Sequence, residues 1–214
     1  MLVVIAIIGL LAGMIVPLAG LVAKKKILAR TRSEVDNLAL AIDTYKAKKG
    51  FYPPDNTNGL YGPCTNQLFY ELWGMVLQNP TTYLNTYNAN PNGAGGFETI
   101  TTGLLGQFFG ASGIVNASAD TNEIRNFIPR INAAELQNIG SSTVPVWVFA
   151  TPARGPTTGL PVPPVAGGQP VNVIRYVSSN PTNNPSSYDL WVDVLIGGKT
   201  NRISNWNKDS EIVY

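Results

Sequence analysis

The first 23 residues carry no charged side chain, and this apolar run ends at three consecutive lysines, Lys24, Lys25 and Lys26. A helix needs about 20 apolar residues to cross the hydrocarbon core of a bilayer, which is about 30 Å thick. A cleaved secretory signal would begin with a basic segment and would have a shorter apolar core. The pattern of residues 1–23 therefore predicts a helix that lies in a membrane or packs against other helices.

The pattern changes after the lysines but stays helical. Residues 27–49 contain no Gly or Pro and are rich in helix-forming residues. Their apolar positions follow one stripe of an amphipathic helix, made of Leu28, Val35, Leu38, Ile42 and Tyr45. Gly50 then supplies a C-terminal cap, and Pro53 prevents continuation. We predict one helix over residues 1–49, about 75 Å long, with an apolar half at 1–23 and an amphipathic half at 24–49.

Four residues in the apolar half would be unusual in a plain membrane anchor. Gly9, Gly13 and Gly20 allow close approach of a neighbouring helix. Pro17 removes one backbone hydrogen bond and is expected to kink or locally melt the helix. These four residues indicate a helix built for packing and bending.

Residues 50–214 predict a globular α+β domain that packs on the amphipathic half through a small antiparallel sheet with extended loops. We expect short helices at 67–77 and 132–139, the second because Asn132 and Glu135 form a capping-box pattern. Residues 79–113 are rich in Gly, Asn and Thr, which favours loops.

Strands are expected in the last third of the chain, at 144–151, 171–178, 188–196 and 199–205. Gly197 and Gly198 predict a hairpin turn between the last two. A Pro- and Gly-rich loop at 154–170 is expected to be either a plain surface excursion or a contact between subunits.

Residue types exclude several functions. The chain has no histidine, which removes Ser-His-Asp and Cys-His catalysis and HExxH zinc sites. Cys64 is the single cysteine, so no internal disulfide can form. The net charge of +2 comes from basic residues beside the apolar helix, which argues against nucleic acid as a partner. Asp189 and Asp193 point to one face of a predicted strand, but with no flanking aromatic cleft we predict no catalytic or cofactor-binding residue and no enzyme.

The N-terminal region resembles a known family. The sequence LVVIAIIGLLAGMIVPLA of residues 2–19 is similar to the N-terminal helix of type IV pilins and type II secretion pseudopilins, in which Gly9 and Pro17 fall at the same places. A phrase typical of the major pseudopilin branch follows, and its residues are Tyr45, Lys46, Gly50, Tyr52 and Pro53.

The C-terminal region resembles the same family. Residues 173–176 look like one of its strands, and its closing stretch is matched by residues 188–191, with Asp189 and Trp191, and by residues 203–206, with Trp206. The resemblance thus covers about residues 1–54 and 171–206 and leaves the middle unmatched.

The chain departs from the family in two ways. The family has a basic leader, a cleavage site and a glutamate upstream of the position that Met1 occupies here. At the position of Met1 itself, the family usually has leucine. We therefore expect the true start to lie upstream of Met1. Pseudopilins also often hold calcium after the strand that contains Trp191, but residues 192–203 offer only Asp193 as an acidic ligand. Asp193 is thus a weak calcium candidate, and a plain hairpin is the favoured interpretation.

The resemblance implies a structural subunit of a type IV pilus-like filament, in particular a type II secretion pseudopilus. Its implied partners are further copies of the chain, membrane lipid before assembly, an inner-membrane assembly platform and minor pseudopilins. The implied location is the inner membrane with the domain in the periplasm or outside the cell, although the positive-inside rule applied to Lys24–Lys26 alone favours the opposite orientation. The alternative is a membrane-anchored binding module outside the cytoplasm, or a minor or adhesive pilin.

Overall fold

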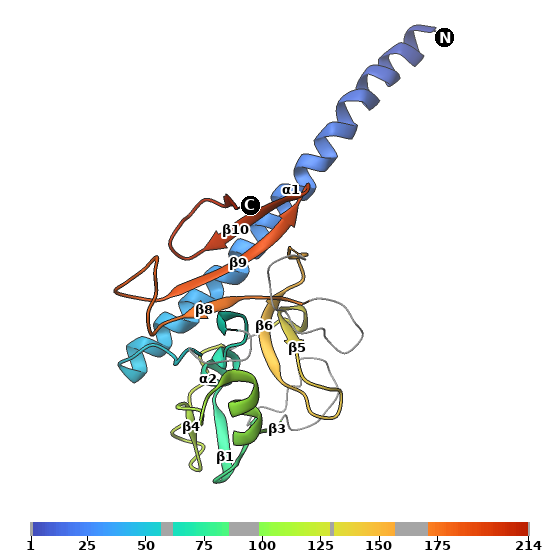
Figure 1. Cartoon of the computed structure of the whole chain (residues 1–214). Helices are drawn as coiled ribbons and strands as arrows, with labels where there is room; N and C mark the ends of the chain where they lie inside the picture. Colours follow the sequence, from blue (N-terminus) through green and yellow to red (C-terminus); the bar gives the residue numbers. More distant parts are fainter. Residues whose placement is uncertain (1, 57–61, 86–98, 129–130, 157–170, 214) are drawn as a thin grey trace.

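One long N-terminal helix and several sheets make up the α+β fold (Figure 1). The computed structural model describes residues 2–56, 62–85, 99–128, 131–156 and 171–213, without the side chains of residues 2, 5–19, 85 and 133. The predicted loop at 154–170 therefore lies mostly outside the described residues.

Helix α1 runs without interruption from Leu2 to Lys49. It ends at Gly50, which has a φ of +87° and donates its amide hydrogen to the Lys46 carbonyl at 2.9 Å. The backbone is helical through Pro17, so the helix is not melted there in this state, and the kink or melting expected from Pro17 stays a prediction. The loss of one hydrogen bond does not break a helix that continues for many residues on both sides.

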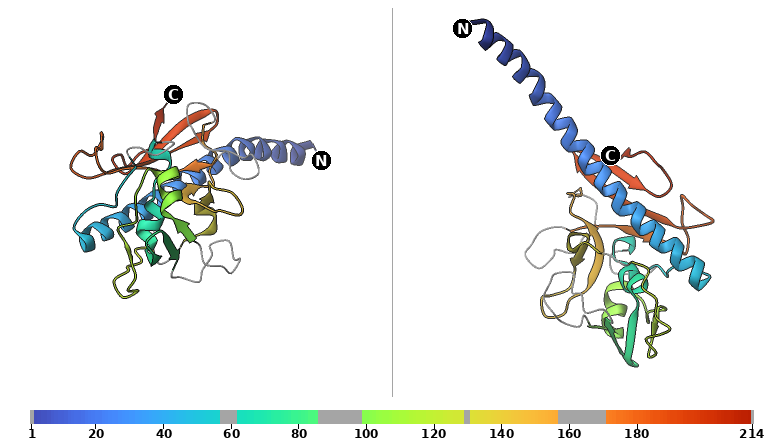
Figure 2. Two further views of the ribbon diagram at one scale, coloured as in Figure 1. Left: turned by 60° about the horizontal axis from the view of Figure 1, so that its bottom comes forward. Right: turned by 180° about the vertical axis from the view of Figure 1, so that it is seen from behind.

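The two halves of α1 have different surroundings. The second half packs on strands β9 and β10, and the predicted stripe is confirmed because Val35, Leu38, Ile42 and Tyr45 are buried and Leu28 is partly buried. The first half leaves the domain and extends away from it, as Figures 1 and 2 show. We call residues 2–27 the projecting segment and residues 28–49 the docked segment.

An antiparallel sheet with the order β11–β10–β9–β8 packs on the docked segment. Its strands are β8 (Arg175–Val177), β9 (Asp189–Ile196), β10 (Lys199–Ser204) and β11 (Glu211–Val213). Ile196 pairs with Lys199 across the turn, and Gly197 and Gly198 have φ values of +59° and +78°. This confirms the predicted hairpin, since a two-residue turn of this kind needs positive φ at both positions.

Two further sheets form the rest of the described domain. One has the antiparallel order β5–β6–β7, and its strands are β5 (Leu136–Asn138), β6 (Trp147–Thr151) and β7 (Asn172–Val173). The other has the order β3–β2–β1–β4, with β1 and β4 parallel, and its strands are β1 (Met75–Asn79), β2 (Thr82–Asn85), β3 (Thr99–Thr101) and β4 (Ala117–Ser118). The sequence predicted one small antiparallel sheet, whereas the described residues form three sheets, one of which contains a parallel pair.

Several predicted boundaries are wrong. The strand predicted at 171–178 is split at Ile174, because β7 pairs with β6 whereas β8 pairs with β9. The helix predicted at 67–77 is shorter: α2 (Leu68–Trp73) ends at Gly74, whose φ is +80°, and the chain continues as β1. A Cβ at position 74 would lie 2.5 Å from Ile124 Cγ2, so both conformation and space require glycine there.

The segments predicted as loop or helix in the middle of the chain also differ. Residues 79–113 contain β2 and β3, α3 (Thr102–Leu104) and a π-helical turn, η2 (Leu105–Phe109). The helix predicted at 132–139 is a single 3-10 turn, η3 (Ala133–Glu135), followed by β5. Its capping pattern is present, because Asn132 Oδ1 accepts from the Ala134 amide at 3.0 Å and the Glu135 carboxylate accepts from the Asn132 amide. Pairing of β5 with β6 stops the helix after one turn. A further 3-10 turn, η1 (Gly62–Cys64), precedes α2.

Candidate assembly interface

The projecting segment presents large apolar side chains to solvent. Val3, Val4, Leu21, Val22 and Ile27 are all exposed, with exposed fractions from 38% to 72%. Contiguous apolar side chains that no other part of a fold covers usually mark a surface for another protein or for lipid. The projecting segment is therefore the first candidate for a functional surface.

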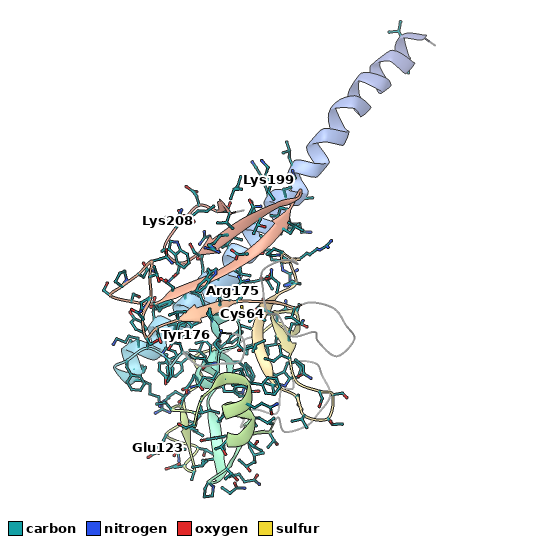
Figure 3. The ribbon with its side chains drawn as sticks, viewed as in Figure 1. Cys64, Glu123, Arg175, Tyr176, Lys199 and Lys208 are labelled. Atoms are coloured by element: carbon teal, nitrogen blue, oxygen red, sulfur yellow. The ribbon has the colours of Figure 1, made fainter. Side chains whose placement is uncertain are left out.

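The lysines mark the point where α1 leaves the domain. Lys24, Lys25 and Lys26 are exposed, and none of them forms an ion pair with another described residue. The tip of the β9–β10 hairpin reaches this point, because a Cβ at Gly197 would lie 2.9 Å from Lys24 Nζ. Lys199 lies at the same tip (Figure 3). These charges lie between the apolar part of the projecting segment and the domain. We call Lys24, Lys25 and Lys26 the lysine collar.

The described side chains leave the membrane prediction for residues 1–23 untested. Among them, no helix has a stretch long and apolar enough to cross a bilayer. The side chains of residues 5–19, which include Gly9, Gly13 and Pro17, lie outside the described residues. Gly20 is described and exposed, and a Cβ there would meet no other described atom within 4 Å.

Arg32 fastens the C-terminal loop to α1. Its guanidinium donates to the backbone carbonyls of Ser204, Asn207 and Lys208 at 2.6, 2.8 and 2.9 Å. Asp36 lies 3.9 Å away on the next helical turn. Hydrogen bonds from a charged donor are stronger than neutral ones, so this single side chain holds the segment after β10 against the helix.

The motif residues that end α1 build the corner between the helix and the domain. Tyr45 is buried and donates to Glu71 Oε2 at 3.1 Å. Lys46 Nζ donates to the Gly50 carbonyl at 2.7 Å and lies 5.0 Å from the centre of the Tyr52 ring. Gly50 is required at the corner by its positive φ.

After the corner, the chain binds to β8 and to the segment before β9. The Pro53 carbonyl accepts hydrogen bonds from Tyr176 Oη at 2.8 Å and Ser178 Oγ at 2.9 Å. The rings of Tyr52 and Tyr188 lie 5.1 Å apart, centre to centre. Burial raises the pKa of Tyr176 and Tyr188, which keeps both hydroxyls protonated as donors. The motif residues Gly50, Tyr52 and Pro53 thus hold the docked segment and the sheet in a fixed relation.

Asp189 organises the loop before β9. Its Oδ2 accepts from the amides of Thr182 and Asn183, both at 2.9 Å, and its Oδ1 accepts from the Asn184 amide at 2.8 Å. Three amides that donate to one carboxylate fix the loop. The ring of Trp191 on β9 packs against that of Trp206, which follows β10, with 5.8 Å between the ring centres.

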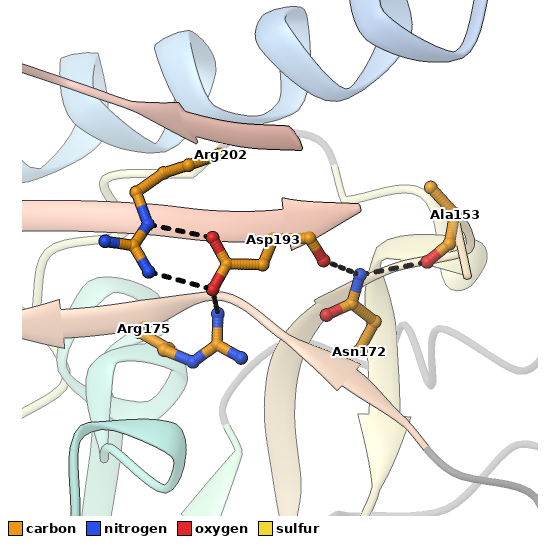
Figure 4. A network of polar contacts seen from close by, with 5 residues as sticks. All are labelled: Ala153, Asn172, Arg175, Asp193 and Arg202. Carbon is orange, nitrogen blue, oxygen red and sulfur yellow. Dashed lines mark hydrogen bonds and ion pairs between the residues drawn. The ribbon is translucent and has the colours of Figure 1, made fainter. Parts of the chain in front are cut away.

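Asp193 lies between two arginines (Figure 4). Arg202 binds both carboxylate oxygens, with Nε at 2.8 Å from Oδ1 and Nη2 at 3.1 Å from Oδ2, and Arg175 Nη1 lies 3.2 Å from Oδ2. The hydrogen bond to Asp193 raises the pKa of Arg202. Asn172 Nδ2 bridges the Asp193 and Ala153 carbonyls at 2.8 and 3.0 Å.

This arrangement bears on both earlier interpretations of Asp193. Its carboxylate already has two cationic partners, so the weak calcium candidate is not set up as a calcium ligand in this structure. Within the described residues, no group of three or more His, Cys, Asp or Glu side chains is arranged to hold a metal ion. Asp189 and Asp193 have separate partners and do not form a carboxylate pair.

Sequence reasoning missed Glu71, which is fully buried. It accepts hydrogen bonds from the amides of Val115 and Asn116 at 2.8 and 3.0 Å, as well as from Tyr45. Burial nevertheless raises its pKa. A single acidic residue inside the apolar run of α2 was the signal in the sequence. Cys64 is buried near the centre of the domain, at the end of the 3-10 turn η1 (Figure 3).

Comparisons of the chain with protein-family models, with curated proteins and with solved structures find no match.

Proposed function

We propose that this chain is a structural subunit of a type IV pilus-like filament, and within that class of a type II secretion pseudopilus. The observation that carries the proposal is the contrast along α1: one continuous helix is docked on the domain over its second half and leaves it over its first half with apolar side chains exposed.

The physical logic of assembly follows from that contrast. Exposed apolar surface is stabilised when it is removed from water, by about 25 cal/mol per Å². Projecting segments of several copies can bury that surface against one another, with the domains on the outside. Before assembly, lipid would cover the same surface. The proposed partners are therefore further copies of this chain and membrane lipid, and the family resemblance adds an assembly platform in the inner membrane and minor pseudopilins.

The motif residues support the same proposal. Gly50, Tyr52 and Pro53 at the corner, and Asp189, Trp191 and Trp206 around β9, stiffen the junction between helix and domain. A subunit that packs through one end of a helix needs its domain held at a defined orientation relative to that helix. This role needs no catalytic residue.

Electron microscopy of material sheared from cells that express the chain tests the proposal. We expect thin fibres that contain this subunit, and a helical reconstruction with the projecting segments in the core. A protein found only as a membrane-bound monomer would instead favour an anchored binding module.

A further inference from the structure

A pocket of about 470 Å³ lies between the docked segment and the chain that precedes β5. Its walls are mainly apolar, and the residues that form them are Leu38, Ala41, Phe127, Ile131, Phe149 and Ile174. Leu40, which is exposed, also lines the pocket. It is large enough for a side chain or a small organic molecule.

Two carboxylates line this apolar pocket, Glu34 from α1 and Glu135 from η3. The Glu34 side chain is only 5% exposed. Its Oε1 accepts from Arg30 Nε at 2.9 Å, but its Oε2 is buried and has no hydrogen-bond partner among the described residues. A buried carboxylate oxygen without a donor is costly, and such groups usually have a partner.

Among the described residues, the groups around the pocket carry more negative than positive charge. Burial, and secondly the negative charge of Glu34, raise the pKa of Glu135, which is a sign that the two carboxylates influence each other. Among the described residues, Arg30 is the cation beside the two carboxylates, and half of its side chain is exposed. Asn37 and Thr44 add neutral polar groups at the lining. The described residues of the pocket therefore combine two carboxylates, one cation and apolar walls.

We propose that this pocket binds a primary ammonium group at the end of an aliphatic chain, with Glu34 Oε2 and the Glu135 carboxylate as acceptors. An ammonium group has three donors, which suits two carboxylates. An aliphatic stem fits against walls such as Leu38 and Phe149, in the way that lysine stems cover apolar surface elsewhere.

The source that we propose is a lysine of a second copy, an assignment that rests on the proposed filament. Lys24, Lys25 and Lys26 are exposed and form no recorded ion pair with described residues. They precede Glu34 by eight to ten residues, about 12–15 Å along a helix. A second copy shifted by that distance along the axis would bring its lysine collar to the level of this pocket.

The pocket chemistry can be tested on the full chain as a monomer in detergent micelles, with labelled isoleucine methyl groups. The probe is n-pentylammonium, and its uncharged match is 1-pentanol. We expect the ammonium to shift the methyl signals of Ile131 and Ile174, but not that of Ile203 on β10, and to bind about tenfold tighter than the alcohol. Equal binding of the two probes, or no shift with either, would overturn the proposal.

Variants assign the acceptors. Glu34→Gln and Glu135→Gln should each weaken pentylammonium binding about tenfold, whereas Asp36→Asn, which changes an exposed carboxylate on the same helix, should leave it unchanged. Glu135→Gln keeps the test valid if Glu34→Gln perturbs folding. An equal loss in all three variants would mean that only the overall charge matters, and would overturn the site.

Cross-linking tests the source. Fibres grown from a mixture of ¹⁴N- and ¹⁵N-labelled copies are treated with a carbodiimide, and we expect peptides that join Lys24, Lys25 or Lys26 of one label to Glu135 of the other. Fibres without such peptides would overturn the lysine assignment. Absence of fibres would count against the filament instead, and the micelle titration would still decide the chemistry of the pocket.

Discussion

The two segments of α1 have the same secondary structure but differ in the burial of their apolar side chains. In the docked segment, the apolar stripe that includes Val35, Leu38 and Ile42 is covered by the domain and Leu40 outside the stripe is exposed, whereas the large apolar side chains described in the projecting segment are exposed. A helix with one apolar stripe needs one apolar partner surface, whereas a helix that is apolar all round needs apolar contacts on every side. The domain supplies the first kind of partner, and the second must come from lipid or from other copies.

We expect the largest effect from substitutions that are confined to the projecting segment. Leu21→Asp together with Val22→Asp should abolish fibres, because two carboxylates would have to be buried in an apolar helix bundle. The free energy of unfolding of the domain should change by less than about 0.5 kcal/mol, since both side chains are exposed in the monomer. Microscopy of sheared material and chemical denaturation in micelles measure the two outcomes.

Ile212→Asp is the matched control, since Ile212 is an exposed apolar residue on β11. It should leave the fibres intact. Fibres that survive the double substitution at 21 and 22 would show that the projecting segment is not the assembly surface.

The next effect compares the same substitution in the two segments. Leu38→Ala should lower the free energy of unfolding by about 2–5 kcal/mol, because Leu38 is 5% exposed and its removal leaves a cavity. Leu21→Ala should cost less than about 0.5 kcal/mol in the monomer, because Leu21 is 56% exposed. Denaturant titration of both variants measures the difference, and equal costs would contradict the division of α1 into two segments.

A smaller effect concerns the polar fastening of the docked segment. Arg32→Met removes the hydrogen bonds to three backbone carbonyls and should lower the free energy of unfolding by about 1.5–3 kcal/mol. Hydrogen exchange of amides after β10 should also become faster. Lys25→Met, a loss of charge on the projecting segment, is the control and should have no measurable effect on either quantity.

The smallest effect depends on pH. The pKa of Glu135 in the folded chain is raised above its ordinary value of about 4.5, so the folded state binds the proton more readily than the unfolded state. Its stabilising contribution is fully present below pH 4.5 and is lost as the pH rises through the raised pKa. Glu135→Gln should therefore flatten the fall in stability in that window, as measured by denaturation at a series of pH values. An unchanged slope in the variant would contradict the raised pKa.

The sequence predicted α1 and the β9–β10 hairpin well, because both depend on residues that are close together along the chain. The stripe from Val35 to Tyr45 repeats with the period of a helix, and the pair Gly197 and Gly198 suits a turn with positive φ. The predictions failed where partners distant in the sequence decide. Ile174 lies in the middle of one predicted strand, 171–178, yet its neighbours on either side pair with strands of different sheets. Residues 136–138 follow a good cap but form a strand, since β6 pairs with them.

The candidate surfaces divide in the same way. The apolar projecting segment and its lysine collar could be named from the order of residues, because hydropathy and charge are properties of single side chains. The partners of Asp193 could not, since Arg175 and Arg202 reach it from neighbouring strands. The pocket that joins Glu34 to Glu135 was equally hidden, because these residues are far apart along the chain.

The sequence by itself thus determined a long helix with one apolar and one amphipathic half, its end at Gly50, and the absence of histidine chemistry. Only the tertiary structure decided where the domain releases the helix, how the strands divide among sheets, and which charged groups are buried together. The physical reason is range: helix periodicity and turn conformation depend on a few consecutive residues, whereas burial and ion pairing depend on which distant segments are brought into contact.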